Sequence, residues 1–304
     1  MNLPDWIARQ LPAGARERMI DVRGERMAVL EWGPADGHAI LLVHGNPTWG
    51  FVWRRVVAEL ATREAGAKLR LVVPDLIGLG RSSKPARAAH SLVHHGEWLG
   101  DAIDQLALGP LVLAAQDWGG AIGLSALAPR RAQLRGMVLG NTAVGPPAAG
   151  FRPTMFHRLS QLPIVSNVLF EGLGFPIGVL DRIQGDRSSI RGDVARAYRW
   201  PLRKLRDRHA PLALARMVPD SHDRHPSVAA LQITNELYAS AKVPIALVWG
   251  MKDPILGRVV NHLARVRPDA SVVKTDAGHF LQEEVPALLA DAIVDVAARA
   301  GWAP

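Results

Sequence analysis

The part of this sequence that most constrains its fold is the stretch Ala115–Gly120, which reads Ala-Gln-Asp-Trp-Gly-Gly. The apolar run Leu111–Ala114 precedes it, and a small-residue pattern with helical spacing, Ala121–Leu127, follows it. A strand, a sharp turn on small residues and a helix together form a nucleophile elbow, which exposes the side chain at its centre. That side chain is Asp117, a residue type that also caps helix N-termini. The local pattern alone therefore leaves two interpretations, a nucleophile and a helix cap.

An aspartate at the centre of the elbow indicates a particular class of reaction. The central residue is usually serine, and a carboxylate cannot attack an ester as a serine alkoxide does. A carboxylate suits displacement at a saturated carbon, which gives an alkyl ester of the enzyme that water then hydrolyses. If Asp117 is a nucleophile, the sequence favours cleavage of a bond to saturated carbon.

Apolar runs typical of buried strands alternate with helical patterns along most of the chain, which predicts a doubly wound, mostly parallel sheet. The expected strands are Glu17–Val22, Met27–Trp32, Ala39–Val43, Leu69–Val73, Leu111–Ala114, Gly136–Gly140, Pro244–Trp249 and Ser271–Lys274. The alternation breaks at Asn141, and the next hundred residues have helical pieces but no buried-strand run. We therefore predict a core formed by residues 1–143 and 241–304. A helical cap, residues 144–240, is inserted before the last two strands and covers the strand ends where such sheets bind ligands.

Two late residues provide the partners that a nucleophile needs. Asp253 follows an expected strand, and His279 lies between the last expected strand and the final helix. In α/β-hydrolases the three residues of the catalytic triad follow one another along the chain in the order nucleophile, acid, histidine. Asp253 alone could be a turn residue beside Pro254, and His279 alone could be a loop histidine. Their joint placement at strand ends predicts a triad with Asp117.

The chain resembles the haloalkane dehalogenases of the α/β-hydrolase fold from about Met19 to its C-terminus. The motifs that carry the resemblance are His44–Trp49, Gln116–Gly120, Gly250–Asp253 and Ala277–Phe280. The resemblance implies that Asp117 attacks the carbon that bears the halogen, forms an aspartyl-alkyl ester and expels halide. It implies that His279 activates water to hydrolyse the ester and that Asp253 orients His279.

The resemblance also implies how the charged species are held. The Asn46 side chain and the Trp118 indole match the pair that binds halide, and the backbone N–H groups of the same two residues match the oxyanion hole. Some relatives take a second tryptophan from the cap, for which Trp200 is the only candidate. Some place the acid after the strand that precedes the cap, where this chain has Asn141, which carries no charge. This combination is typical of a branch whose members associate, so self-association into a homo-oligomer is expected.

Three alternatives compete with this interpretation. An epoxide hydrolase also uses an aspartate followed by tryptophan, and it needs acids above the nucleophile, usually two cap tyrosines. The only tyrosines here, Tyr198 and Tyr238, both lie in or beside the cap, although a buried amide at Asn46 suits halide better. A non-catalytic scaffold of the hydrolase fold would be expected to lack a triad member. A serine esterase is least favoured, because no Gly-x-Ser-x-Gly follows an expected strand.

Composition sets limits on partners and location. The formal net charge is +8, but the arginines are scattered, which does not favour nucleic-acid binding. There are no cysteines, so cysteine-ligated metals are excluded. His90 and His94 have the spacing of a metal pair but lack a third ligand, and we expect no metal or cofactor. We expect His44 to stabilise its own turn. No signal peptide or membrane-spanning run is evident, which predicts a cytoplasmic protein without a membrane partner.

Overall fold

In the computed structural model, which describes residues 3–221 and 223–302, eight strands form one sheet in the order β1-β2-β4-β3-β5-β6-β7-β8. Strand β2 pairs antiparallel with β1 and β4, and all other neighbours are parallel. The predicted mostly parallel sheet is therefore confirmed. The strands are β1 Arg16–Val22, β2 Glu25–Trp32, β3 His38–Val43, β4 Leu69–Pro74, β5 Leu111–Gln116, β6 Leu134–Gly140, β7 Ile245–Gly250 and β8 Ser271–Thr275.

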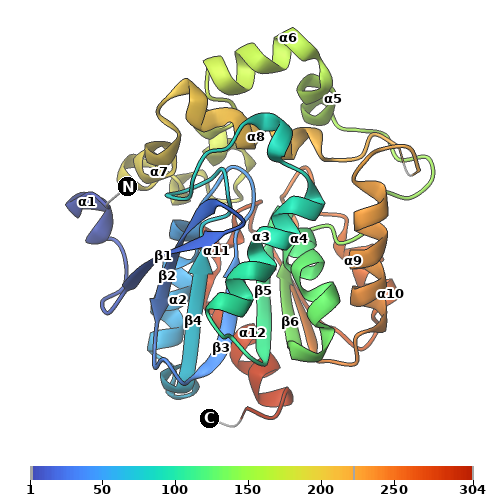
Figure 1. Ribbon diagram of the computed structural model, residues 1–304. Helices are drawn as coiled ribbons and strands as arrows, with labels where there is room; N and C mark the ends of the chain where they lie inside the picture. The colour runs from blue at the N-terminus through green and yellow to red at the C-terminus, as the bar shows by residue number, and fades with distance from the viewer. Residues whose placement is uncertain (1–2, 222, 303–304) are drawn as a thin grey trace.

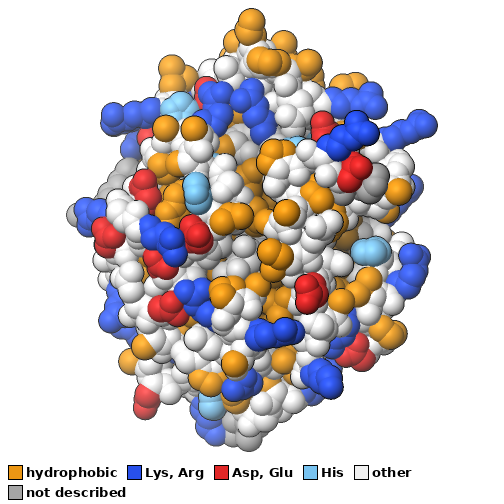
Figure 2. Space-filling model, turned by 45° about the vertical axis from the view of Figure 1, so that its right-hand side comes forward, with side chains coloured by type: hydrophobic (Ala, Val, Ile, Leu, Met, Phe, Trp, Pro, Cys, Tyr) orange, Lys and Arg blue, Asp and Glu red, His pale blue; other side chains and the backbone are white. Residues whose placement is uncertain are grey.

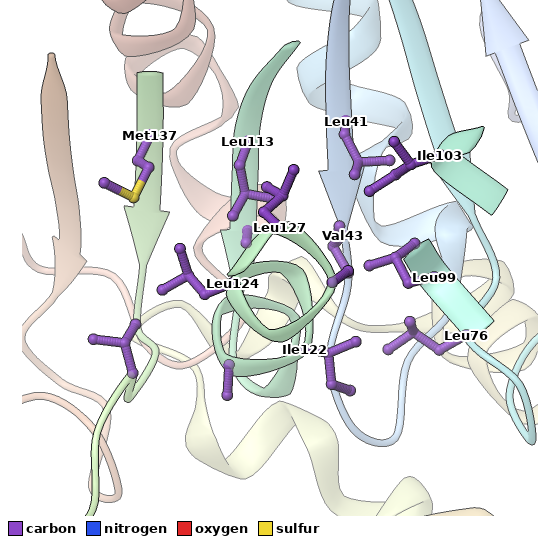
Figure 3. Close-up of a cluster of buried hydrophobic side chains, with 14 of the residues drawn as sticks. Leu41, Val43, Leu76, Leu99, Ile103, Leu113, Ile122, Leu124, Leu127 and Met137 are labelled. Carbon is purple, nitrogen blue, oxygen red and sulfur yellow. The ribbon is translucent and has the colours of Figure 1, made fainter. Parts of the chain in front are cut away.

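Helices cover both faces of the sheet (Figure 1). On one face α3, α4 and α9 pack together, and on the other α2 packs against α12. Figure 3 shows how strand residues such as Leu41, Leu113 and Met137 meet Leu99 of α3 and Leu124 of α4. Because strands β3, β5 and β6 are covered on both sides, they are apolar at almost every position. The main helices outside the top of the cap are α2 Arg54–Ala61, α3 Leu92–Gln105, α4 Trp118–Leu127, α9 Val228–Ser240, α10 Val260–Val266 and α12 Pro286–Arg299.

The register of the central strands places their carboxyl ends side by side. Val43 of β3 pairs with Ala115 of β5, and Gln116 pairs with Gly140 of β6. The residues that follow these strands therefore meet at one edge of the sheet.

The cap lies over this edge, at the top of Figure 1, and it consists of helical segments between β6 and β7, as predicted. Its main segments are α5 Met155–Gln161, α6 Pro163–Ser166, the π-helix η5 Asn167–Gly172, α7 Gly192–Arg199, the 3-10 helix η9 Leu205–Arg208 and α8 His209–Arg216. Helix α9 packs on α4 and contributes Leu231 and Leu237 to the core cluster. The assignment of residues 144–240 to the cap and of 1–143 and 241–304 to the core stays a prediction.

One bent pair of cap segments has the length and apolar composition of a membrane-spanning helix, and no other helix of the described residues does. No single helix among the described residues is long and apolar enough to cross a bilayer. The segments Pro163–Gly172 and Ile177–Ile183, bent by 91° relative to each other, meet the length and composition criteria only when they are combined.

A buried ionic cluster ties the cap to both parts of the core. The Arg54 guanidinium of α2 donates to both carboxylate oxygens of Glu283, over 2.5 and 2.9 Å. Glu283 belongs to the short helix α11 (Leu281–Glu284), and its carboxylate also accepts from the Tyr198 hydroxyl of cap helix α7. Burial and the neighbouring Glu283 charge raise the pKa of Tyr198 well above its usual value, so the hydroxyl stays a donor. The cluster therefore holds one end of the cap against α2 and α11.

Removing one partner of this cluster should destabilise the fold strongly, because it leaves a buried charge uncompensated. We expect Glu283→Ala to lower the free energy of unfolding by about 3–5 kcal/mol. Tyr198→Phe, which removes one hydrogen bond to a charged group, should cost about 1.5–3 kcal/mol. Urea denaturation measures both. The control is Glu59→Ala, whose more exposed pair with Arg63 should contribute at most about 1 kcal/mol. Equal effects of Glu283→Ala and Glu59→Ala would contradict the prediction.

Candidate active site

The backbone at Asp117 forms the sharp turn that the sequence predicts. Its φ of 53° and ψ of −129° lie outside the usual regions for a residue with a side chain, and the surrounding structure must hold such a conformation in place. The Asp117 N–H donates to the carbonyl of Asn141 at 3.0 Å, and its own carbonyl accepts from the Thr142 hydroxyl at 2.5 Å. The Asp117 side chain makes no capping hydrogen bond to α4, which disfavours the helix-cap interpretation.

Small residues allow this turn to lie close to its neighbours. A Cβ on Gly45 would collide with the Asp117 side chain, and one on Gly119 would collide with the backbone of Val43. The loop after β3 therefore approaches the elbow closely enough for a direct bond. The Asn46 N–H donates to Asp117 Oδ1 at 2.6 Å.

The Asp117 carboxylate is partly buried and keeps favourable neighbours, with 16% of its side chain exposed. Burial raises its pKa above the usual value, while the charge of His279 and the backbone N–H groups of Trp118 and Asn46 act in the opposite direction. Two backbone N–H groups therefore stabilise the charged form of a carboxylate that is only partly open to water.

The structure brings His279 and Asp253 to Asp117, as the sequence predicts. Nε2 of His279 lies 3.6 Å from Asp117 Oδ2, and its Nδ1 lies 2.8 Å from Asp253 Oδ2. Burial by itself would lower the pKa of His279, but the charge and hydrogen bond of Asp253 and the charge of Asp117 raise it above the usual value. Burial would raise the pKa of Asp253, yet His279, Asn141 and the Ile255 N–H hold it below the usual value. Asp253 is thus arranged to stay charged beside the imidazole.

Asn141 positions Asp253, a role that the sequence did not indicate. From the sequence alone, Asn141 shows only that the carboxylate found there in some relatives is absent. Its Nδ2 donates to Asp253 Oδ2 at 2.8 Å and to the Gly250 carbonyl at 2.9 Å. Its Oδ1 accepts from the Gly250 N–H at 2.7 Å. Asn141 follows β6 and Asp253 follows the neighbouring β7. Their positions at the ends of adjacent strands were the only sequence feature that could have predicted this contact. The amide fixes the carboxylate that orients His279.

Gln116 is a second residue whose contact the sequence did not indicate. Its Nε2 donates to the His279 carbonyl at 3.1 Å and lies 3.3 Å from His279 Nε2. A carbonyl only accepts, so the amide nitrogen, and not the oxygen, must face the histidine. This arrangement fits a neutral imidazole with its proton on Nδ1, toward Asp253. The Gln116 Oε1 is buried without a hydrogen-bond partner among the described residues.

Asn46 and Trp118, the residues expected to bind halide, both adjoin Asp117 through their backbones. Trp118 follows Asp117 directly in the chain, and the Asn46 N–H bonds Asp117 Oδ1. The Asn46 amide donates one N–H to the Pro211 carbonyl of α8 at 3.0 Å, which links the loop to the cap. Its second amide hydrogen has no acceptor within the described chain. The half-buried Trp118 indole likewise donates to no residue of the described ranges.

The cap residues that the sequence suggested for the site, Tyr198, Tyr238 and Trp200, make their contacts outside it. The Tyr198 hydroxyl donates to Glu283, and the Tyr238 hydroxyl donates to the Leu263 carbonyl at 3.0 Å. Neither contacts Asp117, so the acids required by the epoxide alternative are missing from the site. The Trp200 ring packs against Trp49, with centroids 6.0 Å apart, in the cluster beneath the cap.

His44 stabilises its turn, as expected. Its Nδ1 bonds the Gly45 carbonyl at 2.9 Å, and its Nε2 accepts from the Leu76 N–H at 2.9 Å. Within residues 3–221 and 223–302 no cluster of three histidine or carboxylate side chains is arranged to hold a metal ion.

Comparison with known proteins agrees with this geometry. The family model described as the alpha/beta hydrolase family matches residues 40–292. A haloalkane dehalogenase of Mycobacterium marinum is 33% identical over 273 residues, which cover 88% of each chain. This chain belongs to the haloalkane dehalogenase family of α/β-hydrolases.

Two further proteins are similar to this chain. The crystal structure of a haloalkane dehalogenase from Bradyrhizobium elkani is similar with a TM-score of 0.82 and 25% identity, covering 95% of this chain and 98% of that one. A cis-3-alkyl-4-alkyloxetan-2-one decarboxylase of Xanthomonas campestris pv. campestris is 29% identical over 293 residues, 91% of this chain and 94% of that protein. At least two named activities therefore occur among proteins similar to this one.

The contacts of Asp253 predict how the pKa of His279 responds to mutation. Asp253→Asn should lower this pKa, because it removes the charge and the hydrogen bond that raise it. Adding Asn141→Asp to that variant should raise it again, since the new carboxylate would lie within one hydrogen bond of the position of Asp253. Histidine side-chain NMR signals followed over a pH series measure the pKa, with His279→Gln to assign the signal. The exposed Asp269→Asn is the control, and an unchanged pKa in Asp253→Asn would contradict the assignment.

Proposed function

We propose that this protein hydrolyses small halogenated hydrocarbons to an alcohol and a halide ion, with Asp117 as nucleophile, His279 as base and Asp253 as the orienting acid. The observation that carries the proposal is the surroundings of Asp117. The carboxylate stands on a strained elbow, with a histidine–aspartate pair on one side and the Asn46 backbone N–H bonded to Oδ1. Asn46 and the adjacent Trp118 each keep a side-chain N–H without an acceptor in the described chain.

The first step is displacement at the carbon that bears the halogen. Asp117 Oδ1 is held by the Asn46 N–H, which leaves Oδ2 to attack. A bond forms between Oδ2 and carbon while the carbon–halogen bond breaks, and its electron pair leaves on the halide. No proton moves, because the carboxylate is already ionised. Burial assists this step, since a poorly hydrated carboxylate loses little solvation when it attacks.

The leaving halide needs donors as its charge develops. The free amide hydrogen of Asn46 and the Trp118 indole N–H would supply them in a partly buried site. Preorganised donors of this kind act mainly in the transition state, where the charge appears.

The second step is hydrolysis of the aspartyl ester. His279 Nε2 takes a proton from water as the water oxygen attacks Asp117 Cγ, and Asp253 stabilises the imidazolium. The developing negative charge on Oδ1 is received by the backbone N–H groups of Asn46 and Trp118. The tetrahedral intermediate then releases the alcohol, which recovers the proton from His279. Asp117 is left as a carboxylic acid and becomes a carboxylate again when its remaining proton passes to solvent.

A second candidate reaction is favoured by the similarity to the oxetanone decarboxylase. A four-membered lactone also has a leaving group on a saturated carbon, namely its own carboxylate. Attack by Asp117 on that carbon would open the ring, and the donors of Asn46 and Trp118 would then serve a carboxylate oxygen instead of halide. Loss of carbon dioxide from an oxetan-2-one leaves an alkene, so the products separate the two reactions.

The expectations on location and assembly remain proposals. A cytoplasmic location and self-association into a homo-oligomer were inferred from the sequence and its resemblance, and size-exclusion chromatography with light scattering would test the latter.

The covalent mechanism predicts that only the second step needs His279. His279→Phe should expel one bromide per active site from a short terminal bromoalkane and then stop. Mass spectrometry should find one alkyl adduct on the peptide that contains Asp117, whereas wild-type protein should turn over repeatedly. Asp117→Ala is the control and should give neither adduct nor bromide. Steady turnover by His279→Phe would refute the mechanism, and alkene from an oxetanone without bromide from bromoalkanes would favour the second reaction.

The halide donors can be separated from other tryptophans of the molecule. Trp118→Phe removes one donor and should reduce the rate of halide release on the order of a hundredfold. The loss should be larger for chloroalkanes than for iodoalkanes, because chloride depends more on hydrogen bonding as it leaves. Trp200→Phe is the matched control and should change the rate little, since this ring packs against Trp49. A large loss in Trp200→Phe with little loss in Trp118→Phe would assign the donor to the cap.

A further inference from the structure

The outermost part of the cap exposes a group of aliphatic side chains that nothing in the fold covers. We call this group the cap apex, and its members are Met155, Leu162, Ile164, Val165, Val168, Leu173 and Leu205. Ile164 and Leu173 are 79% and 75% exposed. The segments α5, α6 and η5 pack in succession, and η9, which carries Leu205, packs against η5. Figure 2 shows hydrophobic side chains gathered at the top of the molecule, where Figure 1 places α6.

The cap apex is more than the outer face of ordinary surface helices. The inner faces of these segments are buried, with Phe170 packed against Leu212 and Ala215 of α8. A surface helix normally presents polar residues on its outer face. In η5 the inner Phe170 is buried and the outer Val168 is exposed, so this segment is apolar on both faces. Large exposed apolar patches mark interaction sites.

The fully exposed charges around the cap apex are positive. Arg152, Arg158, Arg203, Lys204 and Arg206 are exposed, and none forms an ion pair with a residue that the structure describes. The acids of the same segments are partly buried and engaged. Glu171 pairs with Arg87 and His209, and Asp207 accepts from the Lys204 N–H. Two copies of this surface would repel each other, so a negatively charged partner is favoured.

We propose that the cap apex binds the surface of a bilayer that contains anionic phospholipids. Aliphatic side chains would enter the outer acyl region while the basic side chains lie among the headgroups, which is the division typical of interfacial helices. Protein interfaces are usually centred on tryptophan, tyrosine and arginine in packed pockets, and the cap apex has only aliphatic residues on a convex surface. This proposal departs from our sequence-based expectation of no membrane partner, which rested on the absence of a spanning segment and a signal peptide.

Docking of the cap would place the active-site cover at a reservoir of apolar compounds, a consequence that rests on the proposed function. Helix α8 packs on the inner side of the cap apex and bonds Asn46 through the Pro211 carbonyl. Halogenated hydrocarbons partition into bilayers, so a docked cap would meet its substrate at high local concentration.

Vesicle flotation tests the proposal without any substrate, so that its outcome is independent of the reaction. We expect the full-length protein to float with vesicles of phosphatidylcholine and phosphatidylglycerol, to bind phosphatidylcholine alone more weakly, and to be released in part by high salt. Ile164→Ser with Leu173→Ser should reduce the bound-to-free ratio at least about tenfold, because two large aliphatic groups are lost from the contact. Arg158→Gln with Arg206→Gln should reduce binding to the anionic vesicles only.

Matched controls keep the result specific. Ile233→Ser removes an exposed aliphatic residue of α9, 55% exposed, and Arg265→Gln removes an exposed arginine of α10. Neither should change flotation, and circular dichroism should show that every variant is folded. Absence of wild-type binding, or equal binding by the apex variants, would overturn the proposal. If the apex variants instead turned an oligomer into a monomer without any vesicle binding, the cap apex would be a contact between copies of this chain.

Discussion

The strained backbone of Asp117 is the feature on which the rest of the site depends. A residue with a side chain adopts a φ of 53° only where its surroundings hold it, and here the ends of three adjacent strands do so. The Asn141 carbonyl and Thr142 hydroxyl bond the turn from β6, and Gly45 lets the loop after β3 approach. The turn places the carboxylate at the sheet edge, where the Asn46 N–H and His279 reach it.

Charge at the site is distributed so that each group keeps one role. Asp253, whose pKa is held below its usual value, stays ionised and raises the pKa of His279. Burial raises the pKa of Asp117, which makes its anion a better nucleophile as long as the backbone N–H groups stabilise it. Gln116 faces the histidine with an amide N–H, which matches the neutral tautomer that can accept a proton from water. The proposed nucleophile Asp117 and the proposed base His279 therefore lie 3.6 Å apart without losing their separate charge states.

The cap is attached to the core by polar contacts on its inner side and presents a different surface outside. Tyr198 joins the buried Arg54–Glu283 pair, and the Pro211 carbonyl bonds Asn46 within the site itself. A movement of the cap would thus displace Asn46, which we propose as a halide donor. The outer side combines aliphatic residues with unpaired basic ones, so the same segment that closes the site would also determine where the protein docks.

Local patterns in the sequence determined the strands, the elbow, the helical insertion and the positions of Asp117, Asp253, His279, Asn46 and Trp118. Each depends on a short apolar run or on a motif at the end of one. Only the tertiary structure decided what those residues touch. Asn141 and Asp253 are far apart in the chain, as are Gln116 and His279, and their contacts follow from strand order and side-chain direction, which periodicity does not encode. The tyrosines show the same limit: the sequence placed Tyr198 and Tyr238 near the cap, but packing directed their hydroxyls to Glu283 and the Leu263 carbonyl, away from the nucleophile.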